Sequence, residues 1–250
     1  MAPEQFNTEW STKQIEFNLA MTAYESVPIY MSINRVVSYL NISLQWLLVL
    51  LAVLSGVEWY WHIAMIVLAF VVADFVNGLV HLYMDHNDAY TSRVGPFIAT
   101  FHLHHDTPRY QDKPIWRVYT DESGYKIWLV FVLMLCVVVG LVGWIPPMLL
   151  CFLAYFCVWS SVAEVSHYLC HNSQAVWVRG LQKLWILLPN RHHMRHHRLD
   201  NVNYAFLNGM SDPLINRIAA RLSRGYRTTT DLHTALYQQK KNKSGSHVNS

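Results

Sequence analysis

The chain has 250 residues, of which 53% are hydrophobic and only 14% are charged. Soluble domains usually carry about 25% charged residues, so the composition argues against a soluble domain and favours an integral membrane protein. The formal net charge of +3 is small, which makes the positions of the basic residues more informative than their number, and no nucleic-acid partner is expected.

Four apolar segments follow a polar N-terminal segment, residues 1–35, in chain order. They cover residues 36–57, 59–82, 127–145 and 148–171, and a helix needs about 20 apolar residues to cross a bilayer. The connections after the first and third segments are very short, and Pro146-Pro147 cannot continue a helix. The sequence therefore predicts an all-α integral membrane protein with four transmembrane helices in two tight hairpins. No removable signal peptide is expected, so the first span should double as the targeting signal.

The region after the fourth span mixes basic residues and tryptophans into an apolar run. Residues 176–188 read VWVRGLQKLWILL, a pattern that predicts a helix lying in the membrane interface. Residues 228–250 are predicted to form a flexible C-terminal tail. The interpretation is thus a cytoplasmic N-terminal segment over 1–35, one membrane domain over 36–227 and a tail over 228–250.

Lysine and arginine are distributed unevenly between the predicted connections. Neither short turn contains them, whereas residues 83–126 and the region after residue 171 are rich in them. By the positive-inside rule, both termini and the 83–126 connection are expected in the cytoplasm. The membrane would be the endoplasmic reticulum in a eukaryote and the inner membrane in a bacterium. The ends of the second and fourth spans then share one membrane face.

Eleven of the 14 histidines fall in four short groups, and all four groups lie at that face, as a histidine-rich cap. The groups read HLYMDH (His81, His86), HLHH (His102, His104, His105), HYLCH (His167, His171) and HHMRHH (His192, His193, His196, His197). Only lysine and arginine set the orientation, so this agreement is independent support for one shared site. The isolated His62, His233 and His247 are expected to be ordinary polar residues.

The spacing inside these groups suits metal binding. Side chains four residues apart lie on one face of a helix. The pairs with this spacing are His81 and Asp85, His167 and His171, His192 and His196, and His193 and His197. His86 points off the face of His81, so Asp85 is preferred as a ligand, and Asn77 continues the same polar edge toward the membrane. Such intramembrane polar groups are costly and usually functional.

The histidine groups have three alternative interpretations: a phosphate-binding basic tract, a carboxylate-bridged di-iron bundle and a single zinc site. HHMRHH by itself is equally typical of a basic tract that binds phosphate, but four groups at one face favour metal. Carboxylate-bridged di-iron bundles need two Glu-x-x-His pairs, and this chain has one, Glu164 with His167. A shell of this size exceeds one tetrahedral zinc site. What remains is a His-dominated centre of two irons, in which neutral imidazoles hold ferrous iron for O2 activation.

The predicted metal ligands are His81, Asp85, His104, His105, His167, His171, His192, His193, His196 and His197. Whether His86, His102 or Glu164 join them stays open. Arg195 and Asn77 are predicted to contact the substrate. The arginines of HHMRHH would also help to keep the neighbouring imidazoles unprotonated, because nearby positive charge lowers the pKa of histidine.

The chain resembles the lipid desaturase family in stretches that read GLVHLYMD, FHLHHDTP, HYLCH and HHMRHH followed by NYAFLNGMSDPL. The family includes plasmanylethanolamine desaturase, the bacterial CarF proteins, the Kua domain and the plant phosphatidylglycerol desaturase that makes a trans double bond. The resemblance runs from about Ala73 to Arg221, and the doublet in HHMRHH is closer to the plasmanylethanolamine branch. The chain departs from the family at His102, at the stretch RYQDKP and at Glu164.

The resemblance implies an O2-dependent desaturase that uses two electrons to form a double bond in an alkyl or acyl chain of a phospholipid. Cytochrome b5 or a ferredoxin is the implied electron donor, and the basic cytoplasmic surface would suit an acidic donor. Three rivals remain: a fatty-acyl or sterol hydroxylase with similar histidine boxes, a metal transporter or sensor, and a membrane anchor. Spans one and three have almost no polar residues, which argues against a transport route.

Overall fold

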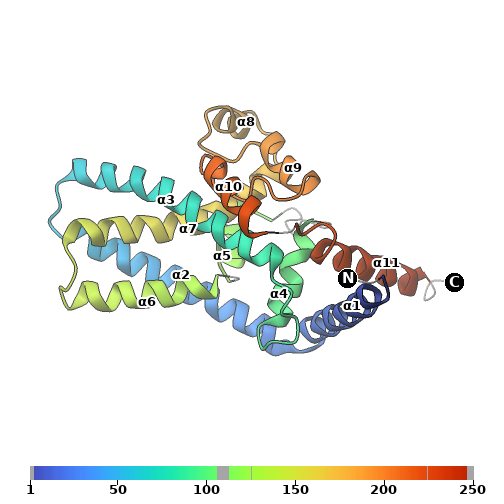
Figure 1. The fold of residues 1–250 in the computed structure, drawn as a ribbon. Helices are drawn as coiled ribbons and strands as arrows, with labels where there is room; N and C mark the ends of the chain where they lie inside the picture. Colours follow the sequence, from blue (N-terminus) through green and yellow to red (C-terminus); the bar gives the residue numbers. More distant parts are fainter. Residues whose placement is uncertain (1–2, 106–112, 125, 224, 247–250) are drawn as a thin grey trace.

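In the computed structural model of the protein, residues 3–105, 113–124, 126–223 and 225–246 are described, and within these ranges the regular structure is helical (Figure 1). The helices are α1 (Pro3–Ser26), α2 (Pro28–Val53), α3 (Trp59–His86), α4 (Gly95–His102), the short 3-10 helix η1 (Leu103–His105), α5 (Ile115–Ser123), α6 (Ile127–Leu141), α7 (Pro147–Asn172), α8 (Val176–Lys183), α9 (Asn190–Arg198), α10 (Asp212–Leu222) and α11 (Thr230–Ser246). Pro108 of the FHLHHDTP motif, most of the RYQDKP stretch and His247 lie outside the described residues.

Three helices, α2, α3 and α7, are long and apolar enough to cross a membrane. The third predicted span differs from the expectation, because α6 ends at Leu141 and Gly143 turns the chain at φ +69°. Its 15 residues extend only about 22 Å, short of a hydrocarbon core of about 30 Å. α6 qualifies as a span only together with α5, from which it is bent by 85°. A fourth span therefore stays a prediction.

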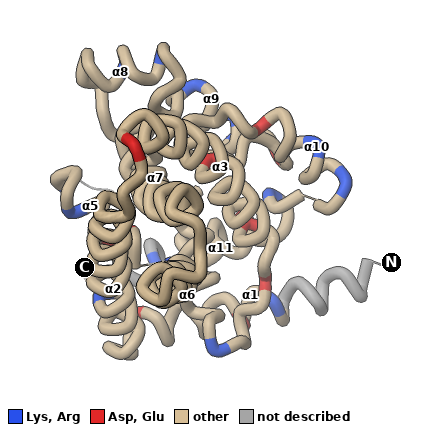
Figure 2. The backbone as a smooth tube through the Cα atoms, turned by 90° about the vertical axis from the view of Figure 1, so that its left-hand side faces the viewer, with Lys and Arg blue, Asp and Glu red and all other residues tan. Residues whose placement is uncertain are grey.

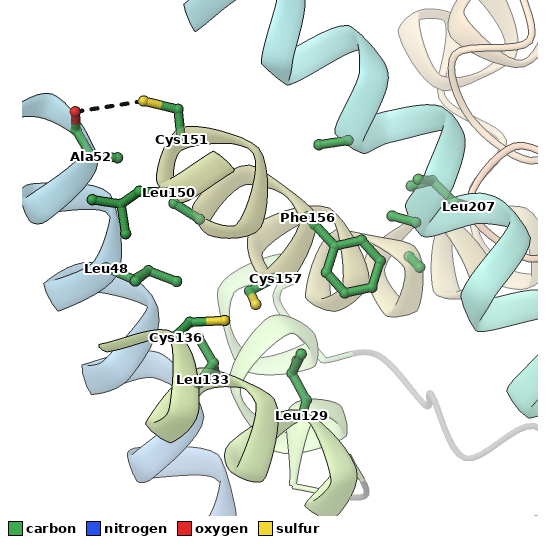
Figure 3. Close-up of a cluster of buried hydrophobic side chains, with 14 of the residues drawn as sticks. Leu48, Ala52, Leu129, Leu133, Cys136, Leu150, Cys151, Phe156, Cys157 and Leu207 are labelled. Carbon is green, nitrogen blue, oxygen red and sulfur yellow. Dashed lines mark hydrogen bonds between the residues drawn. The ribbon is translucent and has the colours of Figure 1, made fainter. Parts of the chain in front are cut away.

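The packing of the bundle differs from two separate tight hairpins. α3 packs chiefly along α7, while α2 packs against both α6 and α7, so that α7 lies between α3 and the α2–α6 pair (Figure 1). Leu48 of α2, Leu133 of α6 and Cys157 of α7 meet in the buried core, and Cys151 Sγ lies 3.7 Å from the carbonyl oxygen of Ala52 (Figure 3). The short turns only reverse the direction of the chain between consecutive helices. Side-chain packing decides which helices lie next to one another.

The outer surface of the bundle is apolar where a soluble protein would be polar. Leu50 of α2, Val67 of α3 and Leu135 of α6 are all exposed. Large exposed aromatic side chains, Trp59 and Trp144, lie at the end that carries the two turns, as expected at a membrane–water boundary. Figure 2 views the bundle from that end and shows the basic positions of α8, α9 and α10 outside it. A lipid environment accounts for this arrangement.

The C-terminal region differs from the predicted flexible tail. Residues Thr230–Ser246 form α11, which packs against α1 at the end of the molecule opposite the turns (Figure 1). The ring of Tyr237 meets Phe17 at a centroid distance of 5.8 Å, and Gln14 Nε2 donates to the carbonyl oxygen of His233 over 3.0 Å. The polar composition of this region did not indicate packing.

The predicted interfacial helix is shorter than expected. α8 ends at Lys183, and the chain turns through Trp185 at φ 55° before it reaches α9. In Figure 1, α8 lies beside the bundle, at the level where α3 and α7 approach their C-terminal ends.

Candidate metal centre

The last turns of α3 and α7, the short helix η1 and α9 bring nine potential metal ligands together. Two groups are formed, and within each group one ligand atom per residue lies within 4.8 Å of the others. The α3 group consists of His81, Asp85, His104, His105 and His196, and the α7 group consists of His167, His171, His193 and His197. About 33 Å of helix separates Trp59 from His81, so the centre lies near one boundary of the hydrocarbon core.

The imidazoles of the α3 group point their Nε2 atoms at one another. His81 Nε2 lies 3.2 Å from His104 Nε2, and His105 Nε2 lies 3.1 Å from His196 Nε2. On the far side of each ring, Nδ1 faces an oxygen. These contacts join His81 to the Tyr204 carbonyl (2.8 Å), His104 to the Phe101 carbonyl (2.7 Å), His105 to Asp231 Oδ1 (2.6 Å) and His196 to the Val202 carbonyl (3.0 Å).

These contacts determine which nitrogen carries the hydrogen. Carbonyl and carboxylate oxygens only accept hydrogen bonds, so each Nδ1 is the donor and each neutral ring keeps a lone pair on Nε2. Four lone pairs then converge with no hydrogen between them. Such an arrangement is repulsive in the metal-free protein and becomes favourable when a cation lies among them.

The carboxylate of Asp85 also favours a bound cation, independently of the imidazoles. It is fully buried, and among the described residues neither of its oxygens has a hydrogen-bond donor. Nε2 of His81 and Nε2 of His196 each lie 3.4 Å from Oδ2, and Nε2 of His105 lies 3.6 Å from Oδ1. An unpaired buried charge costs several kcal/mol. A divalent cation among these residues would remove that cost, so the donor set fits a metal.

The α7 group is a chain of imidazoles with short contacts. His193 Nε2 lies 2.8 Å from His167 Nε2 and 2.9 Å from His197 Nε2, and His171 Nε2 lies 3.2 Å from His167 Nε2. His193 is fully buried, and its Nδ1 has no partner among the described residues. Four nitrogen ligands within one helical turn of α7 and one face of α9 match the ligand number of a metal site.

The two groups are neighbours because α9 contributes to both. His196 belongs to the α3 group, while His193 and His197 on the same helix belong to the α7 group. The ring centroids of His105 and His197 are 5.2 Å apart, and those of His193 and His196 are 5.5 Å apart. Two ions, one in each group, would lie side by side.

Burial favours the neutral form of four candidate ligands outside the spans, His104, His105, His193 and His197. It lowers the pKa of His104, His105 and His193 well below the usual value, and the charges of neighbouring histidines lower it further. For His105 the carboxylate of Asp85 opposes this effect and is outweighed by burial. Burial and the neighbouring His196 lower the pKa of His197 to about 3. Neutral imidazole is the form that binds metal.

A buried loop beneath α9 orients these rings and explains the NYAFLNGMSDPL stretch. Its Tyr204 carbonyl holds His81, and the loop itself is held by Asp74 of α3. The Asp74 carboxylate accepts hydrogen bonds from the backbone N–H groups of Asn208, Gly209 and Ser211 and from the Ser211 hydroxyl, over 2.6–3.1 Å. Gly209 has φ +83°, a conformation that favours glycine.

One predicted ligand lies outside both groups. His192 Nε2 is 2.6 Å from Asp212 Oδ2, and the His192 ring packs edge-on against Trp185. The structure therefore brings together nine of the ten predicted ligands and leaves His192 facing the start of α10. The spacing of four residues from His196 predicted that His192 lies one turn away on α9. Its ring, however, contacts Asp212 and does not join the centre.

The two predicted substrate contacts also lie outside the groups. The Asn77 amide donates to the Ala73 carbonyl (2.8 Å) and to Ser160 Oγ (3.1 Å), and its oxygen accepts a hydrogen bond from Lys126 (2.7 Å). These contacts make Asn77 a link between α3 and α7. Arg195 lies on the outer side of α9, where it lines a surface hollow.

The three residues left open by the sequence have partners elsewhere. His86 Nδ1 faces the Leu82 carbonyl at 2.8 Å, and its Nε2 contacts Ser223 Oγ. His102 Nε2 faces the Met84 carbonyl at 2.8 Å. Glu164 pairs with Lys126 at 3.1 Å. None of the three belongs to either group.

Asp231 is a site residue that the sequence did not indicate. It lies 126 positions from His105, in the region predicted to be a flexible tail, yet its carboxylate accepts the His105 Nδ1 hydrogen over 2.6 Å. No spacing rule connects residues so far apart. The contact between the Tyr204 carbonyl and His81, which also lie far apart in the chain, was not indicated for the same reason. The Val202 carbonyl is close to His196 in the chain, but a backbone group has no sequence signal.

Replacing Asp231 with asparagine is expected to weaken metal binding without abolishing it. The variant exchanges a charged acceptor for a neutral amide, so the orientation and basicity of His105 decrease. Loss of such a partner typically costs about 10–100-fold in metal affinity or activity. Titration of metal into the metal-free protein measures the change. Asp88→Asn, which alters a surface pair with Lys13, is the matched control, and equal losses in both variants would contradict the assignment.

The comparison with protein families agrees with this geometry. Residues 70–221 match the family model described as the lipid desaturase domain, and this range contains all nine ligands of the two groups. Comparisons with curated proteins and with solved structures give no match. The matched range covers more than half of the chain, and it contains the candidate ligand groups, the helical turns that carry them and the loop that orients them. This chain belongs to the lipid desaturase family.

Proposed function

We propose that the protein is a membrane-bound di-iron lipid desaturase, which uses O2 and two electrons to introduce a double bond into an alkyl or acyl chain of a phospholipid. A plasmanylethanolamine desaturase-like reaction that forms a vinyl ether is the specific form proposed. The observation that carries the proposal is the convergence of unprotonated Nε2 atoms around the unpaired carboxylate of Asp85, within a lipid desaturase domain.

The number and type of ligands support two irons. Nine ligands exceed the four that one tetrahedral zinc ion takes. Imidazole nitrogen suits iron as well as zinc and copper, and formation of an alkene from an unactivated chain requires a redox-active metal. When bound, two ferrous ions would supply the electrons that reduce O2 and the oxidising power that removes two hydrogens from the chain.

The residues of the protein itself perform three tasks in this proposal. The carbonyl groups and Asp231 hold the imidazoles in the tautomer that presents Nε2. Burial of the ligands excludes bulk water, which protects a strong oxidant from side reactions. The position near the end of α3 and α7 lets an acyl or alkyl chain approach from the bilayer.

The proposed setting follows from the distribution of charge. α1, α11 and the C-terminal ends of α3 and α7, which carry candidate ligands, lie away from the two turns (Figure 1), and this end carries the basic connections. We assign it to the cytoplasmic face by the positive-inside rule, with residues 127–145, which contain α6, as the fourth span. An electron donor such as cytochrome b5 or a ferredoxin would dock there, in the endoplasmic reticulum of a eukaryote or the inner membrane of a bacterium.

Expression in a host that lacks the activity, followed by lipid mass spectrometry and metal analysis, tests the proposal. We expect about two irons per chain and phospholipids that are lighter by two hydrogens. A product that gains oxygen would identify a hydroxylase instead. Stoichiometric zinc alone with activity intact would refute the di-iron centre, and metal accumulation in cells with unchanged lipids would favour a transporter.

A further inference from the structure

A basic hollow of about 800 Å³ lies between the α7–α8 connection, α8 and the first turns of α9. Four cationic side chains line it: Arg179 and Lys183 from α8, and Arg191 and Arg195 from α9. None of its lining residues is an aspartate or glutamate. The basic positions of α8 and α9 lie at the same edge of the molecule (Figure 2).

These four cations have no negative partner among the described residues. None of them forms an ion pair with any residue in the described ranges, although surface lysines elsewhere, such as Lys13 and Lys241, do. The nearest acidic candidate, Asp212, is buried and bonded to His192 and to the N–H of Ala205. Like charges gathered around one hollow repel one another, so an anion that enters the hollow relieves the repulsion.

The surroundings of the hollow indicate the source of that anion. Trp177, Leu184 and Ile186 beside it are exposed, and Trp185 is both exposed and part of its wall. Apolar and aromatic residues next to arginines are typical of a segment at the membrane interface. Guanidinium groups match phosphate oxygens in paired hydrogen bonds. An anion at this level of the membrane is most simply the phosphate of a lipid.

The hollow is connected to the metal centre through α9. Arg191 and Arg195 face the hollow, while His193 and His197 between and beside them belong to the α7 group. Asn190, another wall residue, donates to the carbonyl oxygen of Cys170, next to His171, over 2.8 Å. A headgroup held here would therefore be placed at a defined distance from the centre.

We propose that the α8–α9 hollow is the binding site for the phosphate group of a phospholipid, and that it positions the lipid chain relative to the two ligand groups. The positioning role rests on the proposed desaturase function. The phosphate site does not, because it follows from the cations and the interfacial residues alone.

The test compares two double variants of the full-length protein, purified in phosphate-free detergent. R191Q/R195Q removes two charges from the hollow, and the matched control R217Q/R221Q removes two exposed charges from α10. Binding is titrated with short-chain phosphatidic acid, with the corresponding diacylglycerol and with inorganic phosphate. We expect the wild type and the control to bind phosphatidic acid equally and R191Q/R195Q to bind it at least about 10-fold more weakly, since each lost bond involves a charged group.

Diacylglycerol is expected not to bind the hollow, and inorganic phosphate is expected to bind more weakly than the lipid. Metal content equal to that of the wild type shows that R191Q/R195Q is folded. Unchanged lipid binding by R191Q/R195Q, or an equal loss in R217Q/R221Q, would overturn the proposal. Inorganic phosphate binding as tightly as the lipid would replace it with a free-anion site. Unchanged lipid binding with a raised requirement for an acidic electron-carrier protein would replace it with a protein-docking site.

Desaturation assays distinguish a failure of the phosphate-site proposal from a failure of the proposed desaturase function. If the wild type desaturates lipids, R191Q/R195Q should show a raised KM for the phospholipid with its iron retained. If no lipid is desaturated at all, the binding titration still decides whether the hollow is a phosphate site.

Discussion

Replacing His193 with alanine is expected to abolish lipid desaturation and to lower the metal content, whereas replacing the adjacent His192 with glutamine should leave the metal content close to that of the wild type. His193 Nε2 lies within 2.9 Å of two other imidazole nitrogens of the α7 group. His192 instead faces Asp212 at 2.6 Å, and glutamine can still donate a hydrogen bond there. Removal of a direct ligand should reduce metal affinity and activity by more than about 10–100-fold, which is the typical cost of losing a residue that only orients a ligand.

Iron per chain and the yield of desaturated lipid in membranes measure this contrast. His196→Ala and His197→Ala should behave like His193→Ala, since each removes one ligand from its group, while the protein still accumulates in the membrane. The comparison also decides whether the histidines of HHMRHH are metal ligands or only part of a phosphate-binding tract. In the second case His193→Ala would keep its iron and at least half of its activity.

Replacing Asp85 with asparagine is expected to remove metal from the α3 group and, at the same time, to stabilise the metal-free protein. The carboxylate has no hydrogen-bond donor and lies 3.4–3.6 Å from three Nε2 atoms that keep lone pairs. Asparagine is neutral, and its amide can donate to those nitrogens. Relief of the unsatisfied buried group should raise the free energy of unfolding of the metal-free protein by about 1–3 kcal/mol, while metal binding and desaturation are lost.

Asp74→Asn on the same helix is the control, and its expected effect on the free energy of unfolding is opposite in sign. Asp74 accepts four hydrogen bonds from the loop beneath α9, so an amide in its place turns a donor toward donors and should destabilise the protein. Thermal melting of both variants after metal removal, with metal titration alongside, tests the pair. A lower melting temperature for metal-free Asp85→Asn, or full metal retention, would show that Asp85 is structural.

Much of the candidate ligand set could be predicted from local patterns. Apolar segments of the right length identified α2, α3 and α7, because burial in lipid requires long uninterrupted apolar helices. A spacing of four residues identified His81 with Asp85 and His167 with His171, because the helix repeat places such side chains on one face. Both conclusions depend only on residues close together in the chain.

Tertiary contacts decided the features that involve distant segments. Whether a histidine of HHMRHH faces the centre depends on what lies opposite it, and Asp212 of α10 holds His192 away. Asp231 reaches His105 because α11 packs against α1, which the polar sequence of the tail did not indicate. The place of α7 between α3 and α2 likewise follows from side-chain packing. A sequence pattern reflects the geometry of the helix that carries it. The contacts of that helix with distant segments depend on how the whole chain packs.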